Sequence, residues 1–378
     1  MYSTSSSNSN TSISIQTQPL AVQAVDFTGT LDHALLNNEI DIAVHSLKDI
    51  PPSKRWRTGI EIASCLERED PLDVLVVRVP VQPISSTSSS SSSSTSSSSS
   101  PDLCTTRTIQ NLPRGTRVGT SSVRRQAQLL HLRNDLELVN LRGNVGSRLN
   151  ALEDGTVDAL LLASAGLNRL IAVATSSSSS AAASMNSTNA STCDDTTSTS
   201  TSTSTSTKRQ PVFYHPNLNL CWSDIPPEEL LSGACQGIVA STCRSEDRTT
   251  LNLLREIDHC DSSIAAAAER SFLDGLDSFR PALALHESQG SSEWIGRPPL
   301  AALLRREVNV KANVNTSTST VGDEGWIFQG ILARPDGSRV LKTLEKVNGV
   351  LSIKDAKTLG RDQAKKLLLE AGYDFYQL

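Results

Sequence analysis

Two low-complexity tracts determine which parts of this chain can fold. Residues 85–100 are only Ser and Thr, and residues 175–207 are almost entirely Ser, Thr, Ala and Asn. Such tracts bury too little apolar surface to offset the entropy lost on ordering, so both are predicted to be disordered insertions in surface loops. Residues 1–24 have a similar composition and are also predicted to be disordered.

Between the tracts, short apolar runs alternate with segments of helical spacing. Strands are predicted at residues 40–46, 74–80, 116–120, 136–141 and 157–164, and helices at 31–39, 121–133, 144–155 and 165–171. This alternation of strand and helix is typical of α/β domains built on a doubly wound parallel sheet.

The last third of the chain follows a different order of elements. A long helix is predicted at 262–276, a β-hairpin at 325–337 and a closing helix at 355–372. A separate C-terminal α+β domain is therefore expected over residues 247–378. Two doubly wound domains are expected before it, the first from residues 25–84 with 226–246 and the second from 101–174 with 208–225.

Composition excludes several classes of protein. The net charge of −5 argues against a general nucleic-acid or membrane-surface binder. The apolar run at 159–167 is about half the ~18 residues that a membrane span requires. The seven cysteines include no CxxC pair, which favours free thiols over a disulfide scaffold or a zinc site. We therefore expect no metal, no nucleic-acid partner and no membrane partner.

Hydroxyl and guanidinium groups follow one of the predicted strands. Thr120, Ser121 and Ser122 lie between a strand end and a helix start, and Arg124 and Arg125 follow in the first helical turn. Hydroxyls can cap a helix, and its free N–H groups can bind an anion. Because the helix dipole disfavours cations in the first turn, the arginine pair suggests a bound anion. The alternative is an ordinary capped surface helix.

Arginines also follow the next two predicted strands. Arg142 and Arg148 come after one of them, and Arg169 comes after the other. The carboxyl ends of strands in a doubly wound sheet converge on one crevice, where these side chains would repel one another unless a polyanion bound there. Arginine suits carboxylates and phosphates, and the absence of a phosphate loop favours a polycarboxylate. The alternative is a set of scattered, solvated arginines.

A smaller polar cluster ends the first predicted strand. Ser46, Lys48 and Asp49 follow it directly, and Pro51 then stops the run. A carboxylate facing an arginine-lined crevice could protonate a leaving group or stabilise a developing cation. A surface turn stiffened by prolines is the alternative. His45 is expected to support this cluster rather than to catalyse.

Six segments together resemble the porphobilinogen deaminase family, in that family's order and from about Asp26 to the end of the chain. They are "DIAVHSLKDIPP", "EREDPLDVLV", "VGTSSVRRQAQLL", "LRGNVGSRL", "DALLLASAGLNRL" and "AERSFLDGLD". Residues 233–244 are similar to the family's Gln-Gly segment, where the chain returns to the first domain. The resemblance implies two periplasmic-binding-protein-like domains with a cleft between them, a third domain and a monomer.

The resemblance also implies an activity and roles for the residues above. The family joins four porphobilinogen molecules head to tail, releases ammonia and forms hydroxymethylbilane. Asp49 matches the catalytic aspartate, which would assist amine loss and stabilise the cationic azafulvene. The substrate and cofactor carboxylates would be bound by Ser46, Lys48, Thr120, Ser121, Ser122, Arg124, Arg125, Arg142, Arg148 and Arg169.

The chain departs from the family pattern at two places. Phe279 lies where the family has the cysteine that holds the dipyrromethane cofactor covalently, and the family's first strand is missing from the N-terminal region. A phenyl ring cannot form a thioether. The alternative to the family activity is therefore an impaired paralogue or incomplete sequence that at most binds tetrapyrroles or other polycarboxylates. The expected location is the plastid, with the cytoplasm as the alternative.

Overall fold

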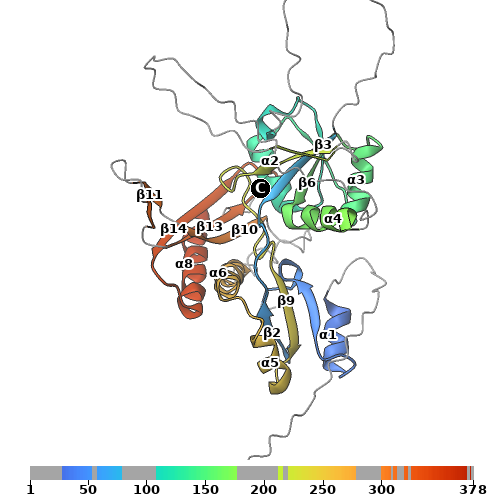
Figure 1. The fold of residues 1–378 in the computed structure, drawn as a ribbon. Coiled ribbons are helices and arrows are strands. Elements are labelled where there is room, and N and C mark those ends of the chain that lie inside the picture. The colour runs from blue at the N-terminus through green and yellow to red at the C-terminus, as the bar shows by residue number, and fades with distance from the viewer. Residues whose placement is uncertain are drawn as a thin grey trace, which may run out of the picture.

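Strands from distant parts of the chain form four sheets in the computed structural model (Figure 1). The structure describes residues 28–52, 58–78, 108–176, 212–215, 220–277, 299–307, 310–312, 319–321, 325–372 and 375. The predictions for residues 1–24, for 85–100 and for Phe279 lie outside this range, as does nearly all of 175–207. Within it, no helix is long and apolar enough to cross a membrane.

The largest sheet has six strands in the order β5-β4-β6-β3-β8-β7. Its central strands are parallel where β4 pairs with β5 and β6, and antiparallel where β3 pairs with β6 and β8. Their bounds are β3 Asp73–Arg78, β4 Arg117–Gly119, β5 Glu137–Val139, β6 Ala159–Ala163, β7 Val212–His215 and β8 Leu220–Ile225. The sheet is therefore mixed: the predicted parallel pairing holds for β4 with β5 and β6, and the pairings of β3 differ from it.

Helices cover both faces of this sheet, as a doubly wound fold requires. Leu75 and Val77 of β3 pack under α2 (Val123–Leu132), whereas Val74 and Val76 face α3 (Val145–Glu153) and α4 (Ser164–Ser176). All four side chains are buried because β3 lies inside the sheet with a hydrophobic core on each side. The α/β class is confirmed.

The membership of β3 differs from expectation. Residues 25–84 were grouped with the first domain, but β3 (73–78) lies in the six-stranded sheet beside β6 and β8. A run of apolar residues shows that a strand is buried, and it does not show which sheet the strand joins. The chain passes from one sheet to the other between β2 and β3.

A three-stranded antiparallel sheet of order β1-β9-β2 carries the polar cluster near residue 48. Its helices are α1 (Gly29–Leu36) and α5 (Arg248–Arg255). The strands are β1 (Ala43–Ser46), β2 (Ile60–Cys65) and β9 (Val239–Arg244). Strand β1 is at the sheet edge, and a single turn of 3₁₀ helix, η1 (Leu47–Asp49), follows it directly.

The C-terminal part contains the predicted helix, hairpin and closing helix. Helices α6 (Cys260–Asp277) and α8 (Ile353–Ala371) pack against each other and against a sheet of order β10-β13-β14. Its strands are β10 (Leu300–Glu307), β13 (Gly325–Ala333) and β14 (Val340–Asn348), and a separate pair joins β11 (Val310–Ala312) to β12 (Ser319–Val321). Phe272 and Phe328 form the centre of this core with an edge-to-face ring contact of 5.4 Å.

Two crossover segments, which lie side by side, connect the two α/β sheets. The first runs from Leu66 to Leu72 and the second from Pro226 to Ile238. The backbone N–H of Glu69 donates to the carbonyl of Gly237 at 3.0 Å. Gly237 has φ +87°, and a Cβ there would lie 2.3 Å from the Glu69 carbonyl oxygen, so only glycine fits this contact.

The described cysteines only partly follow the prediction of free thiols. Cys65, Cys235 and Cys243 are free and buried, and Cys260 is free and exposed. Cys221 forms a disulfide, which differs from the expectation of free thiols throughout. No group of His, Cys, Asp or Glu within the described residues could hold a metal ion.

Candidate functional site

Asp73 holds the arginine pair of α2. The carboxylate accepts hydrogen bonds from Arg124 Nη1 at 2.6 Å and from Arg125 Nη2 at 2.7 Å. Asp73 is completely buried, and the two arginines are 7% and 5% exposed. Burial tends to raise the pKa of Asp73, but the two guanidinium charges outweigh it and hold that pKa well below its usual range. Asp73 therefore stays ionised and neutralises one of the two arginines.

The amino end of α2 is left without a side-chain cap. Ser122 is the N-cap residue, but its hydroxyl makes no capping hydrogen bond, so the predicted capping was wrong for this side chain. Thr120 is fully buried, and its Oγ1 accepts a hydrogen bond from the Ser122 backbone N–H at 3.3 Å. Ser121 and Ser122 are partly exposed. Their hydroxyls and the N–H groups of the first turn are thus available to an anion.

Lys48 and Asp49 lie in η1, in the other α/β sheet, and both are exposed. Desolvation by the surrounding protein lowers the pKa of Lys48, and repulsion from Arg125 and Arg124 lowers it further, while Asp49 and Asp73 oppose the shift. The charges of Arg124, Arg125 and Asp73 therefore affect the pKa of Lys48, although Lys48 follows β1 of the other sheet. The two polar clusters predicted from sequence are brought into one electrostatic neighbourhood.

Arg148 belongs to the same neighbourhood. Its Nε donates to the Gly143 carbonyl at 3.0 Å, across the loop that leads into α3. Desolvation and the charge of Arg125 lower the pKa of Arg148. Arg142 and Arg169 lie on exposed positions after β5 and β6, and no ion pair involves them within the described residues. The structure therefore connects Arg148 to the arginine pair, and it shows no comparable link for Arg142 or Arg169.

The charges of this neighbourhood do not cancel. The cations are Lys48, Arg124, Arg125 and Arg148, and the carboxylates that act on them are Asp49 and Asp73. Among these six described side chains the positive charges exceed the negative ones by two. Cations that repel one another favour a bound polyanion, and guanidinium groups match the geometry of carboxylates. We call this set of six side chains the cationic cluster.

His45 and Ser46 lie in β1, directly before η1. His45 is 7% exposed, and burial lowers its pKa although the charges of Asp32 and Asp49 oppose that shift. The imidazole is therefore neutral near pH 7. Ser46 is half-buried at the end of the strand. The supporting role of His45 stays a prediction.

Sequence reasoning assigned no role to two residues that shape this site, Asp73 and Gln236, although both lie in segments that resemble the family. The amide of Gln236 donates to Asp73 Oδ1 at 2.9 Å from the second crossover segment. An aspartate that directly precedes the apolar run Val74–Val77 was the available signal, because a charged residue is rarely buried without a partner. The partner could not be named from sequence.

The cationic cluster fits the carboxylates of the dipyrromethane cofactor that the resembling family uses, but the described thiols do not fit its covalent attachment. The excess positive charge of the cluster fits the carboxylates of such a group. The described thiols do not fit covalent attachment, because burial raises the pKa of Cys65 to about 11 and raises that of Cys235 further. Cys260 is exposed but begins α6, about 25 Å of helix away from Asp277, which precedes Phe279. No described cysteine can replace the one that Phe279 displaces.

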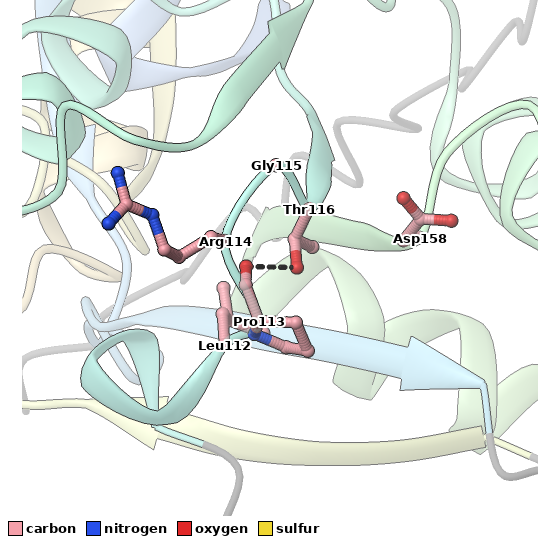
Figure 2. A pocket seen from close by; sticks show the side chains of 6 residues that line it. All are labelled: Leu112, Pro113, Arg114, Gly115, Thr116 and Asp158. Carbon is pink, nitrogen blue, oxygen red and sulfur yellow. Dashed lines mark hydrogen bonds between the residues drawn. The ribbon is translucent and has the colours of Figure 1, made fainter.

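A small pocket lies elsewhere on the six-stranded sheet (Figure 2). It is lined by residues 112–116 and Asp158, and within it Thr116 Oγ1 donates to the Pro113 carbonyl at 2.7 Å. These residues precede β4 and β6, so the pocket is at the amino ends of those strands. Arg124, Arg125 and Arg148 follow β4 and β5, and they therefore lie toward the opposite, carboxyl ends of the parallel strands.

Comparisons with known proteins show which family this chain resembles. A family model described as "Porphobilinogen deaminase, dipyromethane cofactor binding domain" matches residues 14–191. The chloroplastic porphobilinogen deaminase of Oryza sativa subsp. japonica is 30% identical over 350 residues, which are 93% of this chain and 68% of the relative. The porphobilinogen deaminase of Pelotomaculum thermopropionicum is 30% identical over 342 residues, which are 90% of this chain and 75% of the relative.

A solved structure gives a weaker likeness. YhfZ from Shigella flexneri is 14% identical with a TM-score of 0.24, over 65% of this chain and 77% of that one, and this carries no argument about the fold. The family match begins at Ser14, upstream of Asp26, in residues whose structure is not described. This chain belongs to the porphobilinogen deaminase family of transferases, and residues 14–191 match that family's dipyrromethane cofactor-binding domain.

Proposed function

We propose that this chain condenses porphobilinogen head to tail, with release of ammonia, to give hydroxymethylbilane in tetrapyrrole biosynthesis. The observation that carries this proposal is the buried arginine pair at the amino end of α2, in which Asp73 holds Arg124 at 2.6 Å and Arg125 at 2.7 Å. Cationic side chains together with the exposed carboxylate of Asp49 suit a substrate that has several carboxylates and one amine. The names of the relatives support the same activity.

The arginines would bind the acetate and propionate groups of the growing chain. Arg124 and Arg125 are held by Asp73 and so are oriented before a ligand arrives, which reduces the entropy lost on binding. Arg148 supplies a further charge beside Arg125. Arg142 and Arg169, at exposed strand ends, would reach carboxylates farther along a longer product.

Asp49 would assist departure of the amine. Asp49 directly follows Lys48 in the exposed turn η1. There its carboxylate would accept a hydrogen bond from a substrate ammonium and stabilise positive charge that develops as ammonia leaves. Lys48 would meanwhile attract a substrate carboxylate. Ser46 and the uncapped end of α2, with Thr120, Ser121 and Ser122, would add neutral donors around the ligand.

The cofactor supplies the primer on which the chain grows in this family. The residues of the cationic cluster would hold its carboxylates, but Phe279 lies at the position where the family has the attachment cysteine. A second candidate function follows from that substitution and from the raised pKa values of Cys65 and Cys235. In it the chain is an impaired paralogue, or an incomplete sequence, that binds tetrapyrroles or other polycarboxylates without turnover.

Turnover separates the two candidates. The purified chain is incubated with porphobilinogen, and substrate loss and ammonia release are followed together with the intact mass. Condensation predicts both signals, their loss in Asp49→Asn, and their retention in Glu256→Gln, which changes an exposed acid at the end of α5. If hydroxymethylbilane binds but porphobilinogen is not consumed, the binding protein is the correct reading.

Further attributes of the family are proposed for this chain. The two α/β sheets and the C-terminal part are proposed as three domains, with the first boundary moved to precede β3. We propose a monomer, which light scattering on a sizing column would test. One relative is chloroplastic, and we therefore propose the plastid for this chain. Another relative is bacterial, so the cytoplasm is the alternative, and imaging of a tagged chain would distinguish the two.

A further inference from the structure

Gln236 connects the second crossover segment to the carboxylate that holds the arginine pair. Its Nε2 donates to Asp73 Oδ1 at 2.9 Å, and also contacts the carbonyls of Pro71 at 2.8 Å and Leu72 at 3.2 Å. The side chain is 2% exposed. One buried amide therefore contacts both the first crossover segment and Asp73.

The backbone around Gln236 is held in place from several sides. Cys235 has φ +62°, a left-handed conformation that is costly for a residue with a side chain. The Cys235 N–H donates to Glu269 of α6 at 2.5 Å, and Arg68 Nε donates to the Gln236 carbonyl at 2.9 Å. Gly237 follows with the close approach to Glu69 described above. The surrounding contacts thus stabilise a conformation that the chain would not adopt alone.

We propose that Gln236 is a positioning residue for polycarboxylate binding, acting through Asp73 on Arg124 and Arg125. The proposal rests on the proposed function, since it assumes that these arginines meet substrate carboxylates. Gln236 itself is not required to touch the ligand.

The hydrogen bonds of Asp73 give the physical reason. Oδ1 accepts from Gln236 and from Nε and Nη2 of Arg125, while Oδ2 accepts from Nη1 of Arg124. Among the described hydrogen bonds of this carboxylate, the one from Gln236 is the only one whose donor is not an arginine. Without it the carboxylate can turn toward the guanidinium groups, and it then competes more strongly with a ligand for their N–H donors.

Gln236→Met tests this, because methionine is of similar size and cannot donate. Binding of preformed hydroxymethylbilane is measured by isothermal titration calorimetry. A lost hydrogen bond to a charged group predicts about tenfold weaker binding. Gln329→Met is the matched control, since Gln329 is a buried glutamine of β13 in the C-terminal sheet, and it should leave affinity unchanged.

A double-mutant cycle separates positioning from a general loss of stability. If Gln236 acts through Asp73, then Gln236→Met should weaken binding in the unchanged chain and have little further effect in Asp73→Asn. Should Asp73→Asn fail to fold, Arg125→Lys replaces it, because it alters the group on which Asp73 acts.

The possible outcomes are distinct. Non-additive losses of affinity support the proposal. Additive losses, or an unchanged affinity in Gln236→Met, overturn it while leaving the proposed function intact. Absence of any binding by the unchanged chain overturns the proposed function and this inference with it.

Discussion

Arg68 and Glu269 form a two-pronged ion pair at the junction of the two α/β sheets and the C-terminal part. Arg68 Nη1 and Nη2 donate to Glu269 Oε1 and Oε2 at 2.6 and 3.2 Å. Glu269 also accepts from the backbone N–H groups of Cys235 and Leu304. One buried carboxylate of α6 thus connects the first crossover segment, the second crossover segment and β10, and it holds the backbone that presents Gln236.

The first prediction concerns this ion pair. Glu269→Gln should lower the free energy of unfolding by about 3 kcal/mol, because it leaves the Arg68 guanidinium without its counter-charge at a site where the carboxylate is fully buried. Urea unfolding followed by circular dichroism measures this. Glu256→Gln, on the surface of α5, should change the stability little. Equal stability of the two variants would show that the pair is not structural.

A second prediction concerns the glycine between the crossover segments. Gly237→Ala should destabilise the fold by about 3 kcal/mol, because it combines a left-handed φ of +87° with a contact of 2.3 Å to Glu69. Gly155→Ala is the matched control. Gly155 has φ +79° and no atom near the added Cβ, so strain alone should cost about 1 kcal/mol. Similar losses in both variants would mean that the close approach contributes nothing.

The pH dependence of ligand binding gives a third prediction. The pKa of Lys48 is lowered by desolvation and by the arginines, so the ammonium loses its proton at a lower pH than an ordinary lysine. A bound polyanion favours the protonated form, and affinity should therefore fall as pH rises through this lowered pKa. Titrations with hydroxymethylbilane between about pH 7 and 10 should show that fall in the unchanged chain and a weaker one in Lys48→Met. Identical pH profiles would place Lys48 outside the binding site.

A fourth prediction tests Arg148. Arg148→Met should weaken binding about tenfold and reduce its dependence on salt, because one of the excess positive charges is removed. Arg78→Met is the control, since Arg78 is exposed, donates to the Glu153 carbonyl and does not belong to the cationic cluster. Equal effects of the two substitutions would indicate a general charge effect rather than a site.

The sequence predicted best those features that depend on residues close to one another along the chain. Polar residues after β4, β5 and β6 could be assigned to one edge, because the carboxyl ends of neighbouring parallel strands lie together. Helices α2, α3 and α6 were predicted from spacing alone. The short strand β2 and the helix α5 were not predicted, since neither has a long apolar pattern.

Long-range relationships could not be predicted. Asp73 meets Arg124 because the chain leaves the three-stranded sheet after β2 and β3 then pairs with β6 and β8. No local pattern encodes that choice of sheet. Gln236 meets Asp73 across 163 positions of sequence. The resemblance to a known family located Asp49 and the arginines, whereas the partners that orient them required coordinates.

The most direct test of the cationic cluster is calorimetric titration of the unchanged chain with hydroxymethylbilane at two salt concentrations. The account predicts saturable binding that weakens as salt increases, because four cations and two carboxylates leave a positive excess to meet the ligand. Arg125→Met should reduce that binding strongly. Absence of binding, or binding that neither salt nor Arg125→Met affects, would contradict the account.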